Sequence, residues 1–177
     1  MIKFGKITTR KGDSGTTCLA DGLTLPKDNL VFEVLGDVDE LHSTLGLLKA
    51  SMEETPDKDE IDWIEHCLLR IGGMIAVPPS RSAFGKVDRV DISDLEELES
   101  RQKKLMEKVN MPPLFITYGG SERGARADLA RAVCRRTERH IVRLIREEEL
   151  SHLSDAQKFL NRLSDWLFVK ARKLDAS

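Results

Sequence analysis

The feature that most constrains this chain is the spacing of its apolar residues, which recur every three or four positions over long stretches. The clearest stretch contains Val31, Val34, Leu35, Val38, Leu41, Leu45 and Leu48. An α-helix turns once every ~3.6 residues, so this spacing gathers the apolar side chains on one face. The sequence therefore predicts a long amphipathic helix from Leu30 to Leu48.

Four later stretches have the same period, and we predict helices over residues 61–75, 93–109, 121–149 and 155–171. Residues 54–59, which carry Pro56, are predicted to separate the first two helices, and Ser121 is predicted to cap the fourth. Residues 78–92 lack a clean period and predict a surface connection. Only residues 114–117 hint at a strand. Five amphipathic helices predict an all-α bundle of the ferritin-like up-down type.

The length of 177 residues suits one domain, so we assign residues 1–177 to a single domain. Within it, residues 29–175 form the helical bundle. Residues 1–28 are rich in Gly, Thr and Lys and predict an extended N-terminal segment laid over the bundle.

The charge and cysteine content exclude several classes of protein. A formal net charge of −2 argues against a general nucleic-acid coat protein, which needs a broad basic surface. Cys18, Cys67 and Cys134 are too few and too scattered for a disulfide framework. No apolar run approaches the ~20 residues that span a bilayer, and the first residues lack a secretory signal. We therefore expect a cytoplasmic protein.

Residues Thr9 to Thr17 combine two glycines, several hydroxyls and two cations, Arg10 and Lys11. Glycines allow backbone N–H groups to converge on an anion, and the cations offset its charge. The segment lacks the Gly-Lys-Ser/Thr ending of a Walker A motif. It is either a phosphate-binding loop or a solvated turn.

The fourth predicted helix carries a row of charged side chains. At ~100° per residue, one side holds Asp128, Arg131, Arg135, Glu138 and Val142, and another holds Leu129, Val133, Ile141 and Leu144. Aligned guanidinium groups suit a polyphosphate because they bind phosphate oxygens in pairs. The alternative is a solvated face stabilised by ion pairs between residues four apart.

The fifth and first predicted helices carry polar residues beside their apolar stripes. Asn161 and Asp165 share a face with Phe168 and Arg172, and we expect the arginines of the fourth helix as partners, either around a ligand or in a structural network. Asp39 lies on the first helix, either on the surface or paired with an arginine. None of the four histidines is placed as an evident general base.

Taken together, these segments resemble the PduO-type cobalamin adenosyltransferases over nearly the whole chain. The similar segments are Thr9–Thr17, Pro26–Asp28, Gly36–Ser43, Phe115–Gly120, Arg131–Arg139 and Phe159–Asp165. The resemblance implies a homotrimeric five-helix bundle with active sites between subunits. It also implies a reaction of ATP with cob(I)alamin that gives adenosylcobalamin and triphosphate, with Mg²⁺ held mainly by the ATP phosphates.

The resemblance further implies roles for individual residues. Those matching ATP-binding positions are Thr9, Arg10, Lys11, Gly12, Asp13, Gly15, Thr17, Lys27, Arg135, Arg136, Glu138, Arg139 and Asn161. Those matching corrinoid-side positions are Phe115, Asp39, Arg131 and Asp165. Arg131 and Asp39 match a pair that forms an intersubunit salt bridge, and Phe115 matches a residue that helps displace the lower base of the corrinoid. These three residues and Arg135 are the predicted catalytic residues.

Three positions depart from the family pattern: Tyr118 stands in place of proline, His42 in place of asparagine and Thr137 in place of alanine. The chain also stops at Ser177, so we expect a shorter cover over the corrinoid than in longer relatives. A corrinoid reductase and an adenosylcobalamin-dependent enzyme are the implied protein partners. Two alternatives remain at this point: an inactive protein that binds or carries ATP or corrinoid, and a helical adaptor that uses residues 131–146 as a basic patch.

Overall fold

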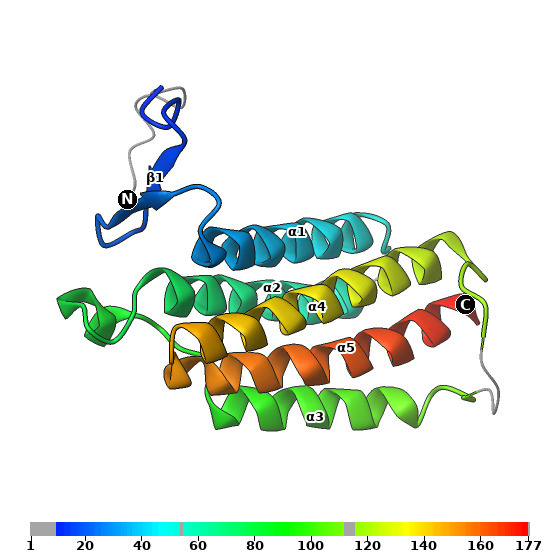
Figure 1. Cartoon of the computed structure of the whole chain (residues 1–177). Helices are drawn as coiled ribbons and strands as arrows, with labels where there is room; N and C mark the ends of the chain where they lie inside the picture. Colours follow the sequence, from blue (N-terminus) through cyan, green and yellow to red (C-terminus); the bar gives the residue numbers. More distant parts are fainter. Residues whose placement is uncertain (1–9, 54, 112–115, 177) are drawn as a thin grey trace.

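Five long helices lie side by side in a computed structural model that describes residues 10–53, 55–111 and 116–176 (Figure 1). In chain order the elements are β1 (Thr16–Cys18), β2 (Thr24–Pro26), α1 (Leu30–Ala50), α2 (Thr55–Ala76), the 3₁₀ helix η1 (Ser82–Lys86), α3 (Ile92–Met106), α4 (Glu122–Glu147), the 3₁₀ helix η2 (Ser151–Leu153) and α5 (Ser154–Asp175). The predicted five-helix bundle is confirmed.

Polar side chains fix where the helices begin. The side chain of Asn29 accepts a hydrogen bond from the Val31 amide at the start of α1, and the predicted cap Ser121 accepts one from the Gly124 amide at the start of α4. The predicted break at residues 54–59 is too long, because α2 already begins at Thr55. Pro56 lies in its first turn, where its missing N–H costs no hydrogen bond.

The core is shared by all five helices. α4 packs against α5 and α1, α5 also packs against α3, and α1 packs against α2. Trp166 and Phe159 of α5 are the largest fully buried hydrophobic side chains. Their burial ties α5 into the centre of the bundle, and Figure 1 shows α5 running between α4 and α3.

One apolar residue of the fourth helix lies outside the core. Val133, Ile141 and Leu144 are buried, but Leu129 is 49% exposed and its neighbour Asp128 only 5%. Near its N-terminus α4 faces the end of α5, where Arg172 forms an ion pair with Asp128. That pair takes the buried position and leaves Leu129 toward solvent.

The N-terminal segment forms a small antiparallel hairpin, in which Thr16 pairs with Pro26 and Cys18 with Thr24. These strands were not predicted, because three residues are too few to show alternation. The predicted strand over residues 114–117 is not found at Ile116 and Thr117, and its first two residues lie outside the described part.

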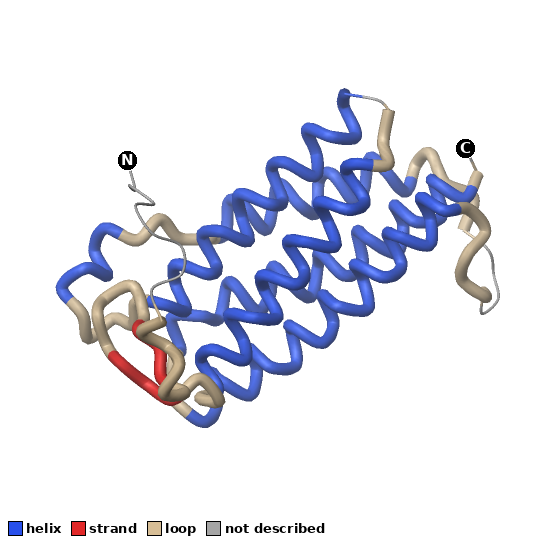
Figure 2. The backbone as a smooth tube through the Cα atoms, turned by 90° about the horizontal axis from the view of Figure 1, so that it is seen from above, coloured by secondary structure: helices blue, strands red, loops and turns tan. Residues whose placement is uncertain are grey.

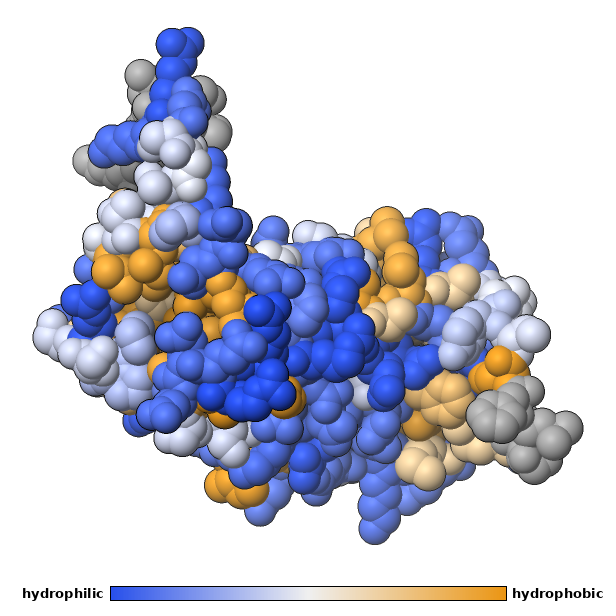
Figure 3. Space-filling view, in the orientation of Figure 1, coloured by the Kyte–Doolittle hydropathy of each residue, from blue (hydrophilic) through white to orange (hydrophobic). Residues whose placement is uncertain are grey.

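The sequence predicts an N-terminal segment laid over the bundle, whereas the hairpin lies at one end of it (Figure 2). Figure 2 places the hairpin and the C-terminus at opposite ends. Leu19, Leu23 and Leu25 line a small hollow together with Val31 of α1 and Ile75 of α2. In Figure 3 hydrophobic side chains gather where the hairpin meets the bundle, on an otherwise largely hydrophilic face. Among the described residues, this hollow and the ion pair between Asp21 and Arg81 hold the hairpin to one end of the bundle.

No helix in the described part of the chain is long and apolar enough to cross a membrane.

Candidate active site

A hollow of about 330 Å³ lies on the surface between α4 and α5. It is lined by Arg135, Glu138, Arg139, Val142 and Asn161. Four of these five residues are predicted ATP-binding residues, and they come from two segments more than 20 positions apart in the sequence. The helical spacing predicted for α4 and the packing of α5 against it bring them together.

Hydrogen bonds order the walls of this hollow. The Asn161 amide nitrogen donates to Glu138 over 3.0 Å, and the Arg139 guanidinium donates to the Arg135 carbonyl over 3.1 Å. The partner of Asn161 on α4 is thus a carboxylate, not the arginine that we expected. The guanidinium groups of Arg135 and Arg139 stay at the surface, so the hollow presents two permanent positive charges to an anion.

Next to Arg135 in the sequence, a buried cysteine joins the two helices that carry the hollow. Cys134 is fully buried on α4, where its thiol donates to the Leu160 carbonyl over 3.2 Å. Burial raises the pKa of the Cys134 thiol far above its ordinary value. Cys134 is therefore a packing residue that joins α4 to α5, and the charges of the hollow are those of its rim.

Arg136 lies away from this hollow. It faces α1, where its Nε is 3.1 Å from Asp37 and its Nη2 donates to Glu40. The same carboxylate of Asp37 is 2.5 Å from His140 Nδ1. Sequence reasoning did not predict that Asp37 pairs with Arg136 and His140, although a carboxylate beside the apolar stripe of the first helix indicates a partner surface. Within the described subunit Arg136 therefore serves the α1–α4 contact.

The predicted phosphate loop leads into β1 and lies at the outer end of the hairpin, away from the bundle (Figure 1). The Gly15 backbone has φ +81° and accepts a hydrogen bond from the Lys27 amide over 2.9 Å. A Cβ on Gly12 would lie 2.9 Å from Lys27 Nζ, so a side chain there would push the ammonium group away from the loop. The fold thus joins the loop to the predicted lysine element, while Thr9 lies outside the described residues.

The loop and the hollow are separate within one subunit. Figure 1 shows the hairpin standing off the bundle beyond the start of α1, whereas the hollow lies along α4 and α5. Among the described residues no hydrogen bond or ion pair joins Arg10, Lys11 or Lys27 to the hollow. Apart from Arg136, which faces α1, the predicted ATP-binding residues in the described part of the chain therefore form two groups.

The predicted corrinoid-side residues are also dispersed. Arg131 lies one turn before Arg135 on α4, and its Nη2 donates to the Tyr118 hydroxyl over 2.6 Å. Asp39 lies on the exposed side of α1 in a shallow hollow with Leu35, Val38, His42, Leu68, Leu69 and Gly72. It makes no contact with Arg131 within the described subunit. Asp165 is exposed on α5, one turn after Asn161, and Phe115 lies outside the described residues.

Comparison with known proteins decides the family. A family model for cobalamin adenosyltransferases matches residues 7–174. This chain belongs to that family.

Relatives of this adenosyltransferase come from distant organisms. The chain is 36% identical to the cobalamin adenosyltransferase of Cupriavidus metallidurans, over 98% of this chain and 90% of the relative. It is also 36% identical to the human corrinoid adenosyltransferase MMAB, over 96% of this chain and 69% of the relative.

Solved structures agree with the fold. A variant PduO-type ATP:corrinoid adenosyltransferase from Lactobacillus reuteri, complexed with cobalamin and ATP, superposes with a TM-score of 0.88 at 29% identity. The superposition covers 97% of this chain and 94% of the other.

The adenosyltransferase offers little of its own to a metal ion. Among the described residues, no group of three or more His, Cys, Asp or Glu side chains is placed to hold one. A single carboxylate, Glu138, lines the α4–α5 hollow, and it already accepts a hydrogen bond from Asn161. This donor set fits a Mg²⁺ ion that is carried mainly by phosphate oxygens.

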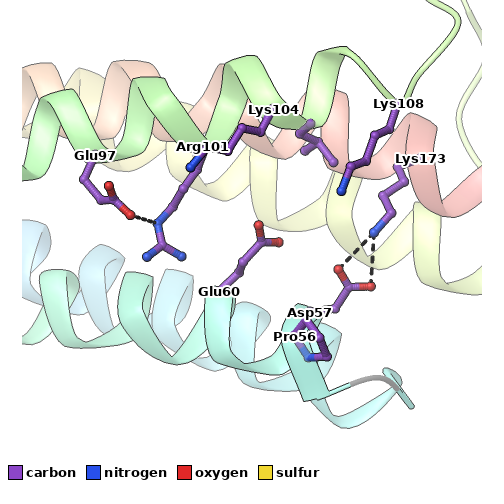
Figure 4. A pocket seen from close by; sticks show the side chains of 9 residues that line it. Pro56, Asp57, Glu60, Glu97, Arg101, Lys104, Lys108 and Lys173 are labelled. Atoms are coloured by element: carbon purple, nitrogen blue, oxygen red, sulfur yellow. Dashed lines mark hydrogen bonds and ion pairs between the residues drawn. The ribbon is translucent and has the colours of Figure 1, made fainter.

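A second hollow of the adenosyltransferase, of about 340 Å³, lies between α2, α3 and α5 (Figure 4). Its charged lining pairs largely with itself: Arg101 with Glu97 over 2.7 Å, and Lys173 with Asp57 over 3.0 Å. None of the predicted substrate-binding residues lines it. We therefore interpret it as a structural charge cluster.

Proposed function

We propose that this protein transfers the 5′-deoxyadenosyl group of ATP to cob(I)alamin. The Co(I) electron pair forms the cobalt–carbon bond at C5′, the C5′–oxygen bond breaks, and triphosphate leaves with the bonding pair. The observation that carries the proposal is the α4–α5 hollow, where Arg135, Glu138, Arg139 and Asn161 meet. The family to which the chain belongs supports the same reaction.

The proposed chemistry needs positioning and charge neutralisation from the protein. The reduced corrinoid is the nucleophile, so no side chain has to remove a proton from it. The guanidinium groups of Arg135 and Arg139 would offset the negative charge that develops on the departing triphosphate. Asn161 and Glu138, already hydrogen-bonded to each other, would orient the nucleotide. Mg²⁺, when bound to the phosphates, would supply further neutralisation of their charge.

The complete site is proposed to form between subunits of a homotrimer. The loop that carries Arg10, Lys11 and Lys27 stands off its own bundle, so a neighbouring subunit is a suitable source of the hollow that it covers. The shallow hollow around Asp39 supports the same assembly, because Leu69 beside it is 60% exposed. We propose that Asp39 of one subunit pairs with Arg131 of the next.

The same proposal extends to the cellular setting. The three free cysteines of the described structure suit the reducing cytoplasm. A reductase that delivers Co(I) and an enzyme that consumes adenosylcobalamin are the partners that this chemistry requires. Sedimentation of the purified protein tests the trimer directly, and a monomer at all concentrations would contradict it.

The decisive experiment is an anaerobic assay with ATP, Mg²⁺ and reduced cobalamin, followed by the absorbance of adenosylcobalamin. Arg135→Ala should lower kcat about 10²- to 10³-fold, because one preorganised charge on the leaving group is lost. The matched control is Arg146→Ala, which removes an arginine of α4 outside the hollow and should leave turnover near the wild-type value. ATP binding by calorimetry without any product from the wild type would instead indicate a binding protein.

A further inference from the structure

The surroundings of Arg131 point to an additional positioning residue for the proposed reaction. Arg131 donates from Nη2 to the Tyr118 hydroxyl over 2.6 Å. Its guanidinium carbon also lies 5.5 Å from the centre of the Tyr118 ring and 5.6 Å from that of Phe168. Two aromatic rings and one hydroxyl thus hold a single guanidinium group.

A buried charge network beside Arg131 supports this arrangement. Asp128 lies 4.0 Å from Arg131 Nε and forms an ion pair with Arg172, and both partners of that pair are almost fully buried. Arg172 also contacts Phe168, at 5.5 Å from the ring centre, and Asp175, at 3.1 Å. Because these groups are shielded from water, each depends on the others for its position.

The end of α5 also anchors the beginning of α4, close to Tyr118. Ser121 donates to the Leu174 carbonyl over 3.1 Å and lies 3.2 Å from Asp175 Oδ1. A Cβ on Gly124 would lie 2.0 Å from that oxygen, so the carboxylate occupies the space that glycine leaves. Tyr118 therefore approaches Arg131 from a segment that is tied to α5 three residues later.

We infer that Tyr118, together with Phe168, clamps Arg131 in the orientation that the corrinoid half of the reaction needs. This inference rests on the proposed function and on the placement of Arg131 near the corrinoid. A flexible arginine loses rotamer freedom when it pairs with a carboxylate or a ligand, whereas a clamped one has already lost it. Tyr118 acts through Arg131 and has no role toward ATP.

The kinetic test uses Tyr118→Phe, which keeps the ring and removes the hydroxyl. The KM for cob(I)alamin should rise about three- to tenfold, as expected for one hydrogen bond to a partly exposed charge, while the KM for ATP stays unchanged. In an Arg131→Lys background the same change should add nothing, because the group on which Tyr118 acts is gone. Leu129→Ala, which alters an exposed side chain outside the clamp, should change neither constant.

A second test needs no turnover. Tyr118 is the only tyrosine in the chain, so a sample labelled at tyrosine Cζ gives one carbon resonance to follow. Arg131→Lys should shift that resonance, and Leu129→Ala should not. An unshifted resonance would overturn the clamp itself.

The failures of the clamp and of the proposed function can be separated. An active wild type whose Tyr118→Phe variant keeps its KM for cob(I)alamin, or shows the same loss with Lys at position 131, overturns the positioning role alone. A wild type that makes no adenosylcobalamin overturns the proposed function and with it that role, while the tyrosine resonance still decides whether the clamp exists.

Discussion

Lys170 gives the sharpest stability prediction, because its ammonium group is fully buried on α5. Its Nζ lies 2.5 Å from Asp57 and 2.7 Å from Glu60, both on the first turns of α2. The two carboxylates are 18% and 27% exposed, so water can only partly replace the lysine. Lys170→Met keeps an unbranched apolar side chain of similar length and removes the ammonium group with its charge and its hydrogen bonds.

The expected loss of stability comes from the carboxylates of Asp57 and Glu60, which lose their buried lysine partner. Removing one partner of a buried charge cluster costs about 3–5 kcal/mol, and the partial exposure of the carboxylates places this case near 3 kcal/mol. For a chain of this length each kcal/mol lowers Tm by about 2–4 °C, so we expect a fall of roughly 6–12 °C. Urea unfolding and thermal melts at pH 7 measure both quantities.

Two comparisons sharpen the result. Lys173→Met removes a lysine that also contacts Asp57 but is 30% exposed, and it should cost about 1 kcal/mol or less. Adding Asp57→Asn and Glu60→Gln to Lys170→Met should recover most of the loss, since no carboxylate is then left without its buried lysine partner.

The stability cost of Lys170→Met should also depend on pH. Burial works to raise the pKa of Asp57, but the ammonium groups of Lys170 and Lys173 outweigh it and hold that pKa below its usual range. The stability that the ionised carboxylate contributes is therefore present above its unfolded pKa of ~3.9 and lost in acid, so the cost of Lys170→Met should shrink there. If Lys170→Met costs no more than Lys173→Met, the cluster does not support the fold as described.

Two further predictions concern other parts of the fold. Burial, with a smaller contribution from Arg89, lowers the pKa of His152 below its ordinary value despite the hydrogen bond to the Met74 carbonyl. The unfolded chain therefore binds more protons than the folded one below about pH 6.5, and the free energy of unfolding should fall as the pH drops. His152→Gln should flatten this loss in unfolding experiments between pH 7 and 5, whereas the exposed control His66→Gln should retain it; equal slopes in both variants would contradict the reasoning. Gly124→Ala should destabilise the fold by about 1–3 kcal/mol, because the new Cβ would collide with the Asp175 side chain. An unchanged urea midpoint would show that the C-terminal end of α5 can move aside at no cost.

The helices could be predicted because each carries several turns of one apolar period. The cap at Ser121 could be predicted from local chemistry, since a hydroxyl there serves the amide three residues later. The hairpin could not, because its strands are three residues long and its pairing depends on Gly15 and Lys27 being brought together by the chain. Periodicity detects long repeats and misses single turns.

The α4–α5 hollow was partly predictable for a similar reason. Arg135 and Glu138 follow from helical spacing, and Asn161 from a polar residue on an apolar helix, whereas Arg139 came from the resemblance to the family. The position of Arg136 could not be predicted from the sequence. Arg136 points ~100° around the helix from Arg135, and the sequence does not reveal that α1 packs against that side of α4. The pairing of Asp128 with Arg172 likewise needs the register of α4 against α5, which only the packed core fixes.

The hairpin that stands off its own bundle has a consequence for inheritance. If its loop closes over the hollow of a neighbour, each active site belongs to two chains. A chain damaged in the loop and a chain damaged on α4 would then each be inactive alone, yet a mixed oligomer would contain a site built from the intact loop of one and the intact helix of the other. Lesions in the two regions would complement each other, whereas two lesions within α4 would not.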